Sequence, residues 1–192
     1  MSSLKEVSSR QLGCMILKYY KEKIVYLPNF QVNDSKDLPP NITLTRKDVG
    51  LPEKGFVFCC FNNAYKITPK IFSSWMRILH KTEESQLWLL ANNDMTIENL
   101  KNEAVKQGIS DTRLVFAPYV NLSEHLNRIK HADLFLDTRP YNAHTTSSDA
   151  LRMGLPVLTC IGKSFSSRVA ASILNSLTLT ELITETEEDY ES

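Results

Sequence analysis

The sequence predicts an α/β protein with a Rossmann-like parallel sheet that is covered by helices on both faces. Two observations predict this fold class. Short apolar runs without polar alternation recur from Gly55 onward, which is typical of buried parallel strands. Each run is followed by apolar residues at helical spacing. This alternation indicates repeated strand–helix units, and we expect residues 51–192 to form a single domain of this kind.

Residues 1–50 lack that regularity and are predicted to form an extended arm or linker. Pro28, Pro39 and Pro40 stand among polar residues, and the apolar pieces are short. We expect one short strand in this arm. The stretch 45–50 predicts a single helical turn that Gly50 closes.

The first strand of the domain is predicted at residues 56–61. Thr68 and Pro69 then supply a helix N-cap and a proline at the first helical position. The apolar residues that follow share one helical face, so the sequence predicts that they belong to the core. These are Ile71, Phe72, Trp75, Met76 and Leu79.

Further strands and helices alternate along the rest of the chain. The strands are predicted at residues 87–90, 114–116, 134–136 and 157–159. The helices are predicted at 97–104 before Gly108, at 122–129, at 146–153 before Gly154, and at 165–174. The acidic end, residues 185–191, is expected to be a solvated surface or the start of a cut helix, so we expect the natural chain to continue.

The composition excludes few functions, but it favours none that depends on a strong net charge. The 192 residues include 22 Lys+Arg and 22 Asp+Glu, so no net field favours nucleic acid or an anionic membrane. We find no signal peptide and no apolar run long enough to span a bilayer, and we expect a cytoplasmic protein. Cys14, Cys59, Cys60 and Cys160 form no Cys-x-x-Cys pair and are expected to be buried, reduced thiols.

The most informative stretch lies between the last two predicted strands, at residues 140–159. A polar loop there leads into a helix that starts with Thr145 and Thr146. The first amides of a helix lack intrahelical partners and lie at the positive end of the dipole, so this point suits a phosphate. His144 precedes the helix and Asp149 lies one turn inside it. A nucleotide-sugar site is indicated, although the threonines could be plain caps and Asp149 a dipole partner.

Other polar residues follow the remaining strands, at the sheet edge where such folds bind ligands. Lys66 suits a departing pyrophosphate as a point charge, but it could also be a solvated surface lysine. His125 and Arg128 share a helix face and could flank a nucleobase or simply be exposed. The clusters contain Asn62, Asn63, Tyr65 and Lys66; Pro118 to Asn121; Asp137, Tyr141 and Asn142; and Gly162, Lys163 and Ser164.

Several familiar sites are missing from the sequence. It contains no Asp-x-Asp pair, no Gly-x-Gly-x-x-Gly and no P-loop, which disfavours a carboxylate-held metal and a dinucleotide or ATP site. His-x-x-x-His spacing and a serine nucleophile elbow are absent too. We therefore expect no metal, with the helix dipole, lysine and histidine stabilising the leaving phosphate.

The motifs resemble those of the O-linked N-acetylglucosamine transferases and their bacterial SPINDLY-type relatives, from about Tyr19 to the end of the chain. The motifs that carry the resemblance are FCCFNNAYKIT at 58–68, LWLL at 87–90, RLVFAP at 113–118, SEHL at 123–126, ADLFLDT at 132–138, NAHTT at 142–146 and SRVAA at 167–171.

This resemblance implies a two-domain GT-B fold, of which the chain is similar to the carboxyl-terminal, donor-binding half. The family transfers N-acetylglucosamine from UDP-N-acetylglucosamine to Ser or Thr of acceptor proteins. It inverts the anomeric centre and uses no metal. The implied partners are therefore a nucleotide sugar and protein acceptors, with no nucleic acid and no membrane.

The resemblance also implies roles for individual residues. Lys66 corresponds to the catalytic lysine on the diphosphate, and His125 and Arg128 to residues beside the uracil. His144, Thr145 and Thr146 correspond to the phosphate loop. Asp149 corresponds to the carboxylate that holds the ribose hydroxyls. Asn63 stands where a glutamine touches the donor.

Two departures leave the donor open. Asn63 replaces that glutamine, and Leu122 replaces a lysine near the base. A protein O-fucosyltransferase that uses GDP-fucose therefore remains an alternative, since plant SPINDLY proteins are similar.

The family's amino-terminal catalytic half and its tetratricopeptide repeats have no counterpart in this chain. We therefore expect weak nucleotide binding and little or no transfer by this polypeptide alone. A non-catalytic nucleotide-binding or interaction module is the second interpretation. A flavodoxin-like signalling domain is disfavoured, because the acidic cluster expected near the first strand is missing.

Overall fold

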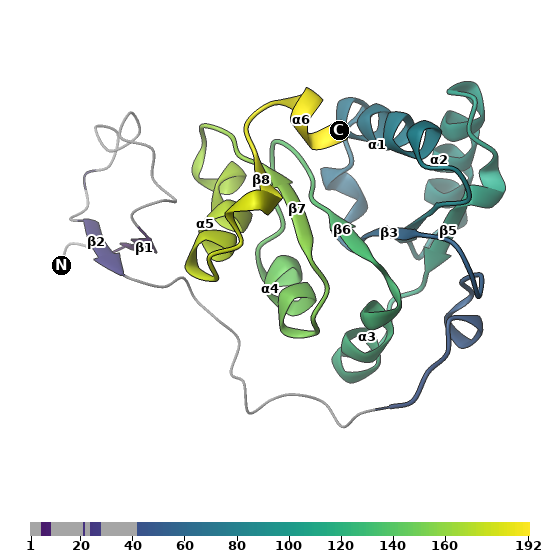
Figure 1. Cartoon of the computed structure of the whole chain (residues 1–192), viewed down its shortest axis with the longest axis horizontal. Helices are drawn as coiled ribbons and strands as arrows, with labels where there is room; N and C mark the ends of the chain where they lie inside the picture. Colours follow the sequence, from purple (N-terminus) through teal and green to yellow (C-terminus); the bar gives the residue numbers. More distant parts are fainter. Residues whose placement is uncertain (1–4, 9–20, 22–23, 28–41) are drawn as a thin grey trace.

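The computed structural model describes residues 5–8, 21, 24–27 and 42–192. Its centre is a six-stranded parallel sheet in the order β5-β4-β3-β6-β7-β8 (Figure 1). In chain order this is the 3-2-1-4-5-6 arrangement of a Rossmann fold, which confirms the predicted fold class. The strands are β3 (Val57–Cys60), β4 (Gln86–Leu90), β5 (Leu114–Ala117), β6 (Leu134–Leu136), β7 (Val157–Cys160) and β8 (Ile183–Thr184).

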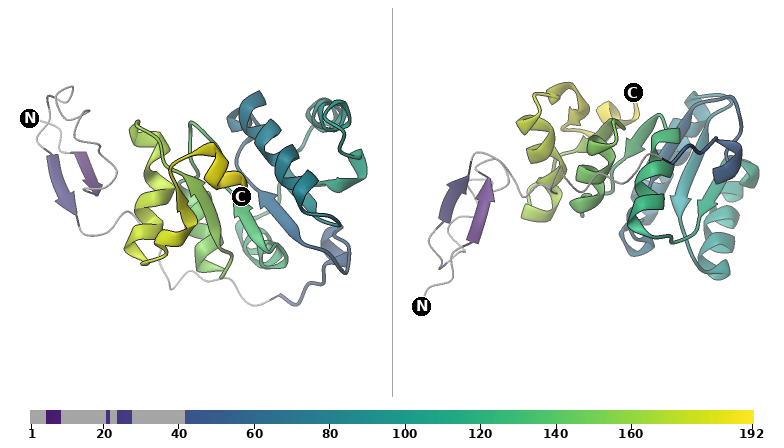
Figure 2. Two further views of the ribbon diagram at one scale, coloured as in Figure 1. Left: turned by 45° about the horizontal axis from the view of Figure 1, so that its top comes forward. Right: turned by 90° about the horizontal axis from the view of Figure 1, so that it is seen from below.

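Helices cover both faces of the sheet. Figure 1 shows α1, α2 and α6 above the strands and α3 and α4 below them, and Figure 2 shows the same layers from two other sides. The α-helices are α1 (Pro69–Lys81), α2 (Asp94–Lys106), α3 (Leu122–Arg128), α4 (Thr145–Arg152), α5 (Val169–Ser176) and α6 (Glu187–Glu191). The 3-10 turns are η3 (Lys47–Val49), η4 (Ala64–Lys66), η5 (Asp111–Arg113), η6 (Ile129–His131), η7 (Phe165–Ser167) and η8 (Thr180–Leu182).

The local signals at α1 act as the sequence predicted. Thr68 caps the helix, because its hydroxyl accepts a hydrogen bond from the Ile71 amide at 3.3 Å. All five residues of the predicted apolar stripe are buried, and Trp75 is fully enclosed. Burying such a stripe against the sheet is what stabilises an amphipathic helix in a domain of this type.

Three of the four cysteines lie in the described part of the chain. Cys59, Cys60 and Cys160 are free and buried, which confirms the expectation for them. Burial raises the pKa of Cys60 well above its usual range, so its thiol stays protonated. Cys14 lies outside the described residues.

The predicted helix at 165–174 is wrong in its first part. Residues 165–167 form the 3-10 turn η7, and α5 begins at Val169. The Ser167 hydroxyl accepts from the Ser164 amide at 3.0 Å and donates to the Ser164 carbonyl at 2.9 Å. These local side-chain bonds compete with helical ones, so the chain turns before the helix starts.

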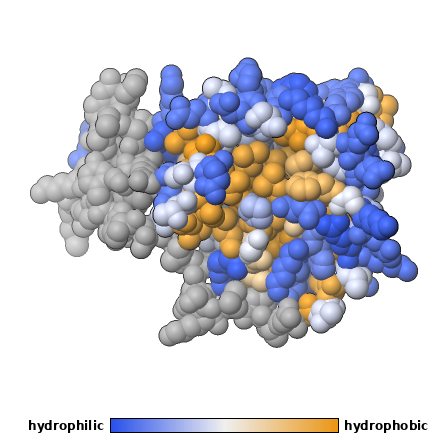
Figure 3. Space-filling view, in the orientation of Figure 1, coloured by the Kyte–Doolittle hydropathy of each residue, from blue (hydrophilic) through white to orange (hydrophobic). Residues whose placement is uncertain are grey.

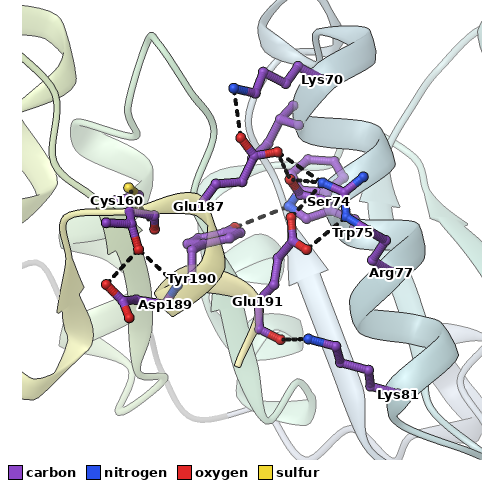
Figure 4. A network of polar contacts seen from close by, with 12 residues as sticks. Lys70, Ser74, Trp75, Arg77, Lys81, Cys160, Glu187, Asp189, Tyr190 and Glu191 are labelled. Atoms are coloured by element: carbon purple, nitrogen blue, oxygen red, sulfur yellow. Dashed lines mark hydrogen bonds and ion pairs between the residues drawn. The ribbon is translucent and has the colours of Figure 1, made fainter.

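The acidic end is not simply a solvated surface. It forms α6, whose Tyr190 is 2% exposed and packs beside α1. Glu187 lies 2.7 Å from Lys70 Nζ and 2.9 Å from Arg77 Nη2, and Glu191 lies 2.6 Å from Arg77 (Figure 4). The preceding strand β8 was not predicted, because two residues give no periodic signal.

The amino-terminal segment contains two short strands where one was expected. β1 (Lys5–Ser8) and β2 (Ile24–Leu27) pair in parallel, with Lys5 opposite Ile24. The helical turn predicted at 45–50 is confirmed as η3, closed by Gly50 at φ 78°. Pro28, Pro39 and Pro40 lie outside the described residues, and the boundary between arm and domain stays a prediction.

The surface in the orientation of Figure 1 is mixed. Figure 3 shows apolar side chains gathered in the middle of this face, with polar side chains around them. No helix in the described ranges is both long enough and apolar enough to cross a membrane.

Candidate functional site

The strand order places a topological switch point between β3 and β6. β4 and β5 extend the sheet on one side of β3, and β6, β7 and β8 extend it on the other. In open parallel sheets, the crevice outside the carboxyl ends of the strands at such a point is the usual ligand site. The residues directly after β3 and β6 therefore meet at the position where a ligand is expected.

Lys66 lies in this crevice, at the end of η4. Its Nζ donates to the Asn142 carbonyl at 3.0 Å and lies 3.9 Å from the centroid of the Tyr141 ring. Burial lowers the pKa of Lys66, and the Asp137 carboxylate opposes that shift. Lys66 is thus half-buried and aimed at the loop before α4, unlike a solvated surface lysine.

The first turn of α4 offers main-chain donors to the crevice. His144 occupies the N-cap position and makes no side-chain cap bond, so the first amides of this helix keep no intrahelical partner. Thr145 is exposed, whereas the Thr146 hydroxyl donates to Asn62 Oδ1 at 2.7 Å. Neither threonine is the N-cap. The Thr146 hydroxyl proton is thus used within the protein, and its amide N–H, in the first turn of the helix, is the donor that Thr146 can offer a ligand.

His144 itself has an unsatisfied ring nitrogen. Its Nε2 is buried and has no hydrogen-bond partner among the described residues. Burial and the neighbouring charge of Lys66 lower the pKa of His144, while a backbone hydrogen bond with Ser166 opposes the shift. A buried polar atom without a partner is costly. A ligand in the crevice would satisfy it.

His125 and Arg128 meet each other and the end of β3. Arg128 Nη2 lies 3.2 Å from His125 Nδ1, and the Phe61 ring lies 5.2 Å from the His125 ring. Arg128 is 4% exposed and donates to the Pro118 carbonyl at 2.7 Å. Arg128 therefore holds the loop after β5, and His125 is the half-buried member of the pair. The interpretation of both as merely exposed residues is wrong.

The burial of His125 has a consequence for stability. Burial, together with the charge of Arg128, lowers the pKa of His125 from 6.5 to about 4. Between these pH values the unfolded chain binds a proton that the folded protein does not, so stability should fall as the pH drops from about 6.5 to about 4. His125→Gln is expected to flatten that part of the profile, measured by urea unfolding at a series of pH values. His80→Gln, on the exposed side of α1, is the control; identical slopes for His125→Gln and wild type would contradict the assignment.

Asp149 lies within α4, and Asn63 lies at the N-cap of η4. Asp149 Oδ1 lies 3.7 Å from Arg152 Nη1, one turn further along α4, and its side chain is 14% exposed. Asn63 is exposed and begins η4, where its carbonyl accepts from the Lys66 amide at 2.9 Å. The structure thus brings Lys66, His144 and Thr146 to the crevice at the switch point, and Asp149 lies one turn further along α4.

A pocket of about 440 Å³ lies on the α1 side of the same sheet edge. None of the predicted donor-contacting residues lines it. Its lining comes from α1, α6, the end of β7 and the loops after β6 and β7, with no residue of α3 or α4, so we place the candidate site by the contacts of Lys66 and not by this cavity. Its lining residues are Thr68, Lys70, Ile71, Ser74, Arg139, Pro140, Cys160, Gly162, Lys163, Ser164, Ser167 and Glu187.

The sequence placed Asn62 and Asp137 in the polar clusters at this edge of the sheet but gave neither of them an individual role. Asp137 and Asn62 are 0% and 1% exposed, and both bond to the loop before α4. The available signal was a polar residue directly after a wholly apolar strand. Among the described residues no group of three His, Cys, Asp or Glu side chains could hold a metal ion.

Comparison with known proteins decides the family. The model of glycosyl transferase family 41 matches residues 16–192. The chain belongs to this family. The predicted resemblance is therefore confirmed, and it extends over the whole of residues 51–192 and most of the amino-terminal segment.

Relatives in family 41 share this region. A protein of Arabidopsis thaliana named as a probable UDP-N-acetylglucosamine–peptide N-acetylglucosaminyltransferase SEC is 39% identical over 80% of this chain and 16% of its own length. The Caenorhabditis elegans UDP-N-acetylglucosamine–peptide N-acetylglucosaminyltransferase is 37% identical over 82% of this chain and 14% of its own. The chain thus spans about a sixth of the family 41 relatives it matches.

A solved structure supports the same assignment. A mutant of Thermobaculum terrenum O-GlcNAc transferase superimposes with a TM-score of 0.84 at 27% identity, covering 98% of this chain and 36% of that one. The family 41 fold of the described residues is therefore the Rossmann-like domain of a GT-B glycosyltransferase, as predicted.

Proposed function

We propose that this chain is the donor-binding part of a protein O-glycosyltransferase that transfers N-acetylglucosamine from UDP-N-acetylglucosamine to Ser or Thr hydroxyls. The observation that carries the proposal is the convergence of Lys66, the unpartnered Nε2 of His144 and the open amides of α4 at the switch point. The names of the family 41 relatives support the donor and acceptor class.

The chemistry follows from where charge develops. When the glycosidic bond breaks, negative charge accumulates on the departing diphosphate. Preorganised N–H donors, a lysine and a helix N-terminus stabilise such charge most effectively where water is excluded. Lys66 would exchange its bond to the Asn142 carbonyl for a phosphate oxygen, and the amides of Thr145 and Thr146 would donate from the other side. His144 would donate through Nε2 as the imidazolium, which the dianionic diphosphate stabilises. No metal is required by this arrangement, and we propose that none takes part.

The remaining assignments concern the nucleoside. His125 and Arg128 lie on α3, against the Phe61 ring that follows β3, and would hold the base. The carboxylate of Asp149 would accept from the ribose hydroxyls. Asn63, exposed beside Lys66, would contact the donor where it enters.

A residue that activates the acceptor hydroxyl is not assigned, so we propose that the rest of the enzyme supplies it and that this chain alone turns over little. We also propose a cytoplasmic location.

The test is calorimetric titration of the chain with UDP, GDP, UDP-N-acetylglucosamine and GDP-fucose. We expect UDP and its conjugate to bind more tightly than the guanine nucleotides, with no change when a chelator is added. Tighter binding of GDP and GDP-fucose would replace the proposal with protein O-fucosylation. Binding of neither diphosphate would contradict a donor site and leave the non-catalytic module. A radiolabelled transfer assay with a peptide mixture then measures turnover, which we expect to stay at background.

A further inference from the structure

One buried carboxylate organises the loop that carries the candidate site. Asp137 follows β6 and is 0% exposed. Its Oδ1 accepts from the Thr138 amide at 2.7 Å and from the Ala143 amide at 2.6 Å. Both amides share one oxygen, so the segment between them is closed into a compact turn. That turn ends one residue before His144 and the start of α4.

The same residue is fixed to the elements on either side of it. Its Oδ2 accepts from the Thr159 hydroxyl on β7 at 2.6 Å. Its main-chain carbonyl accepts from the Tyr190 hydroxyl on α6 at 2.9 Å. That hydroxyl accepts in turn from Trp75 Nε1 on α1 at 3.1 Å (Figure 4). Asp137 is thus held by β7 and by α6, and α1 holds Tyr190 in turn, so the turn that Asp137 closes cannot shift without breaking buried hydrogen bonds.

Asn62 secures the turn from the other side of the switch point. It follows β3, is 1% exposed, and donates through Nδ2 to the Thr138 hydroxyl at 2.8 Å. Its Oδ1 accepts from Thr146 in the first turn of α4 at 2.7 Å. One amide side chain therefore connects the beginning of the loop to the beginning of the helix.

The use of a charged residue here needs a reason, because burying a carboxylate is expensive. Burial raises the pKa of Asp137 to about 7, although the bonds from Thr159, Ala143 and Thr138 and the charge of Lys66 oppose the shift. An ionised oxygen forms shorter and stronger bonds to N–H groups than a neutral one does. The stronger hydrogen bonds make the turn rigid. This turn positions the Asn142 carbonyl beneath Lys66 and the amides that open α4.

We propose that Asp137 is a positioning residue for the diphosphate, acting with Asn62 to aim the start of α4 and Lys66 at the phosphate oxygens. The inference rests on the proposed donor site and assigns to it two residues that touch no ligand. Misplacement of such groups by a fraction of an ångström is sufficient to weaken an electrostatic site. The nucleoside contacts lie on α3 and should not depend on this turn.

The test compares UDP with uridine on Asp137→Asn, which keeps the size of the side chain but removes its charge. We expect UDP affinity to fall about tenfold, the size of effect typical of a weakened charge-assisted hydrogen bond, while uridine affinity is unchanged. The matched control is Asp133→Asn at the amino end of β6. Asp133 accepts from the Val57 amide at 2.8 Å and from Arg46 at 2.8 Å, at the opposite edge of the sheet. It should destabilise the fold without changing the ratio of UDP to uridine affinity.

Amide hydrogen exchange gives a second readout that needs no ligand. The Thr138 and Ala143 amides should exchange slowly in the wild type and in Asp133→Asn, and fast in Asp137→Asn. An unchanged affinity ratio together with unchanged protection overturns the inference. If Asp137→Asn does not fold, Asn62→Ala takes its place, with the same loss expected for UDP and for protection of the loop. If the wild type binds no UDP, the proposed function fails. The amide hydrogen exchange measurement then still decides whether the Asp137 carboxylate holds the turn.

Discussion

Lys66→Met is expected to weaken UDP binding by about 10- to 100-fold and to leave uridine binding unchanged. A hydrogen bond to a charged group is worth about 1.5–3 kcal/mol, and each 1.4 kcal/mol is a factor of ten in affinity. Methionine has nearly the length of lysine, so the half-buried stem stays packed while the ammonium over Tyr141 and Asn142 is lost. Calorimetric titration with both ligands measures the effect.

The control for this variant is Lys106→Met, at an exposed position near the end of α2. It removes the same charge from the whole protein but not from the switch point. Raising the salt concentration should weaken UDP binding to the wild type more than to Lys66→Met, because the variant has lost the main screened attraction. UDP affinity within twofold of the wild type in Lys66→Met would contradict the role of Lys66 at the diphosphate.

Trp75→Ala is expected to cost about 3–5 kcal/mol of unfolding free energy, the range for large buried aromatic residues. Trp75 is 0% exposed, and its Nε1 donates to the Tyr190 hydroxyl, so the change leaves a cavity and also removes a partner of Tyr190. Domains of this size are stable by only about 5–15 kcal/mol, so the variant should be close to unfolding at room temperature. Urea unfolding followed by far-ultraviolet circular dichroism measures the loss.

Trp75→Phe separates the two contributions. Phenylalanine keeps most of the apolar volume and removes the N–H, so a loss of about 1–3 kcal/mol is expected from the broken buried hydrogen bond. A loss below about 1 kcal/mol for Trp75→Ala would show that α6 and α1 do not form the packed unit described here, because a cavity of this size always carries a larger cost.

The helices and strands were predictable because their signals are local. The apolar runs at β3, β4, β5, β6 and β7 are continuous over several residues, and Thr68 with Pro69 marks the start of α1 without help from the rest of the chain. The signal was weaker where local bonds compete with a helix, as at Ser164 and Ser167, and for β8, which is too short to show a period.

The residues of the site were predictable from the sequence, but the hydrogen bonds that they make were not. His144, Thr145 and Thr146 were identifiable as the residues that open a helix after a strand, and Lys66 as a cation after another strand. Which of their groups remain available to a ligand depends on partners far away in the sequence. The Thr146 hydroxyl is occupied by Asn62, 84 residues earlier, and Lys66 Nζ by the Asn142 carbonyl, 76 residues later.

The amino-acid sequence alone therefore determined the class of fold, the order of its elements and the family, because apolar periodicity, caps and contiguous motifs are encoded by neighbouring residues. The tertiary structure decided the order of strands in the sheet, the position of the switch point and the roles of Asp137 and Asn62. The physical reason is that a buried polar group is satisfied by whichever partner the packed sheet places beside it. Asn62 and Thr138 are 76 residues apart in the chain and 2.8 Å apart in the fold.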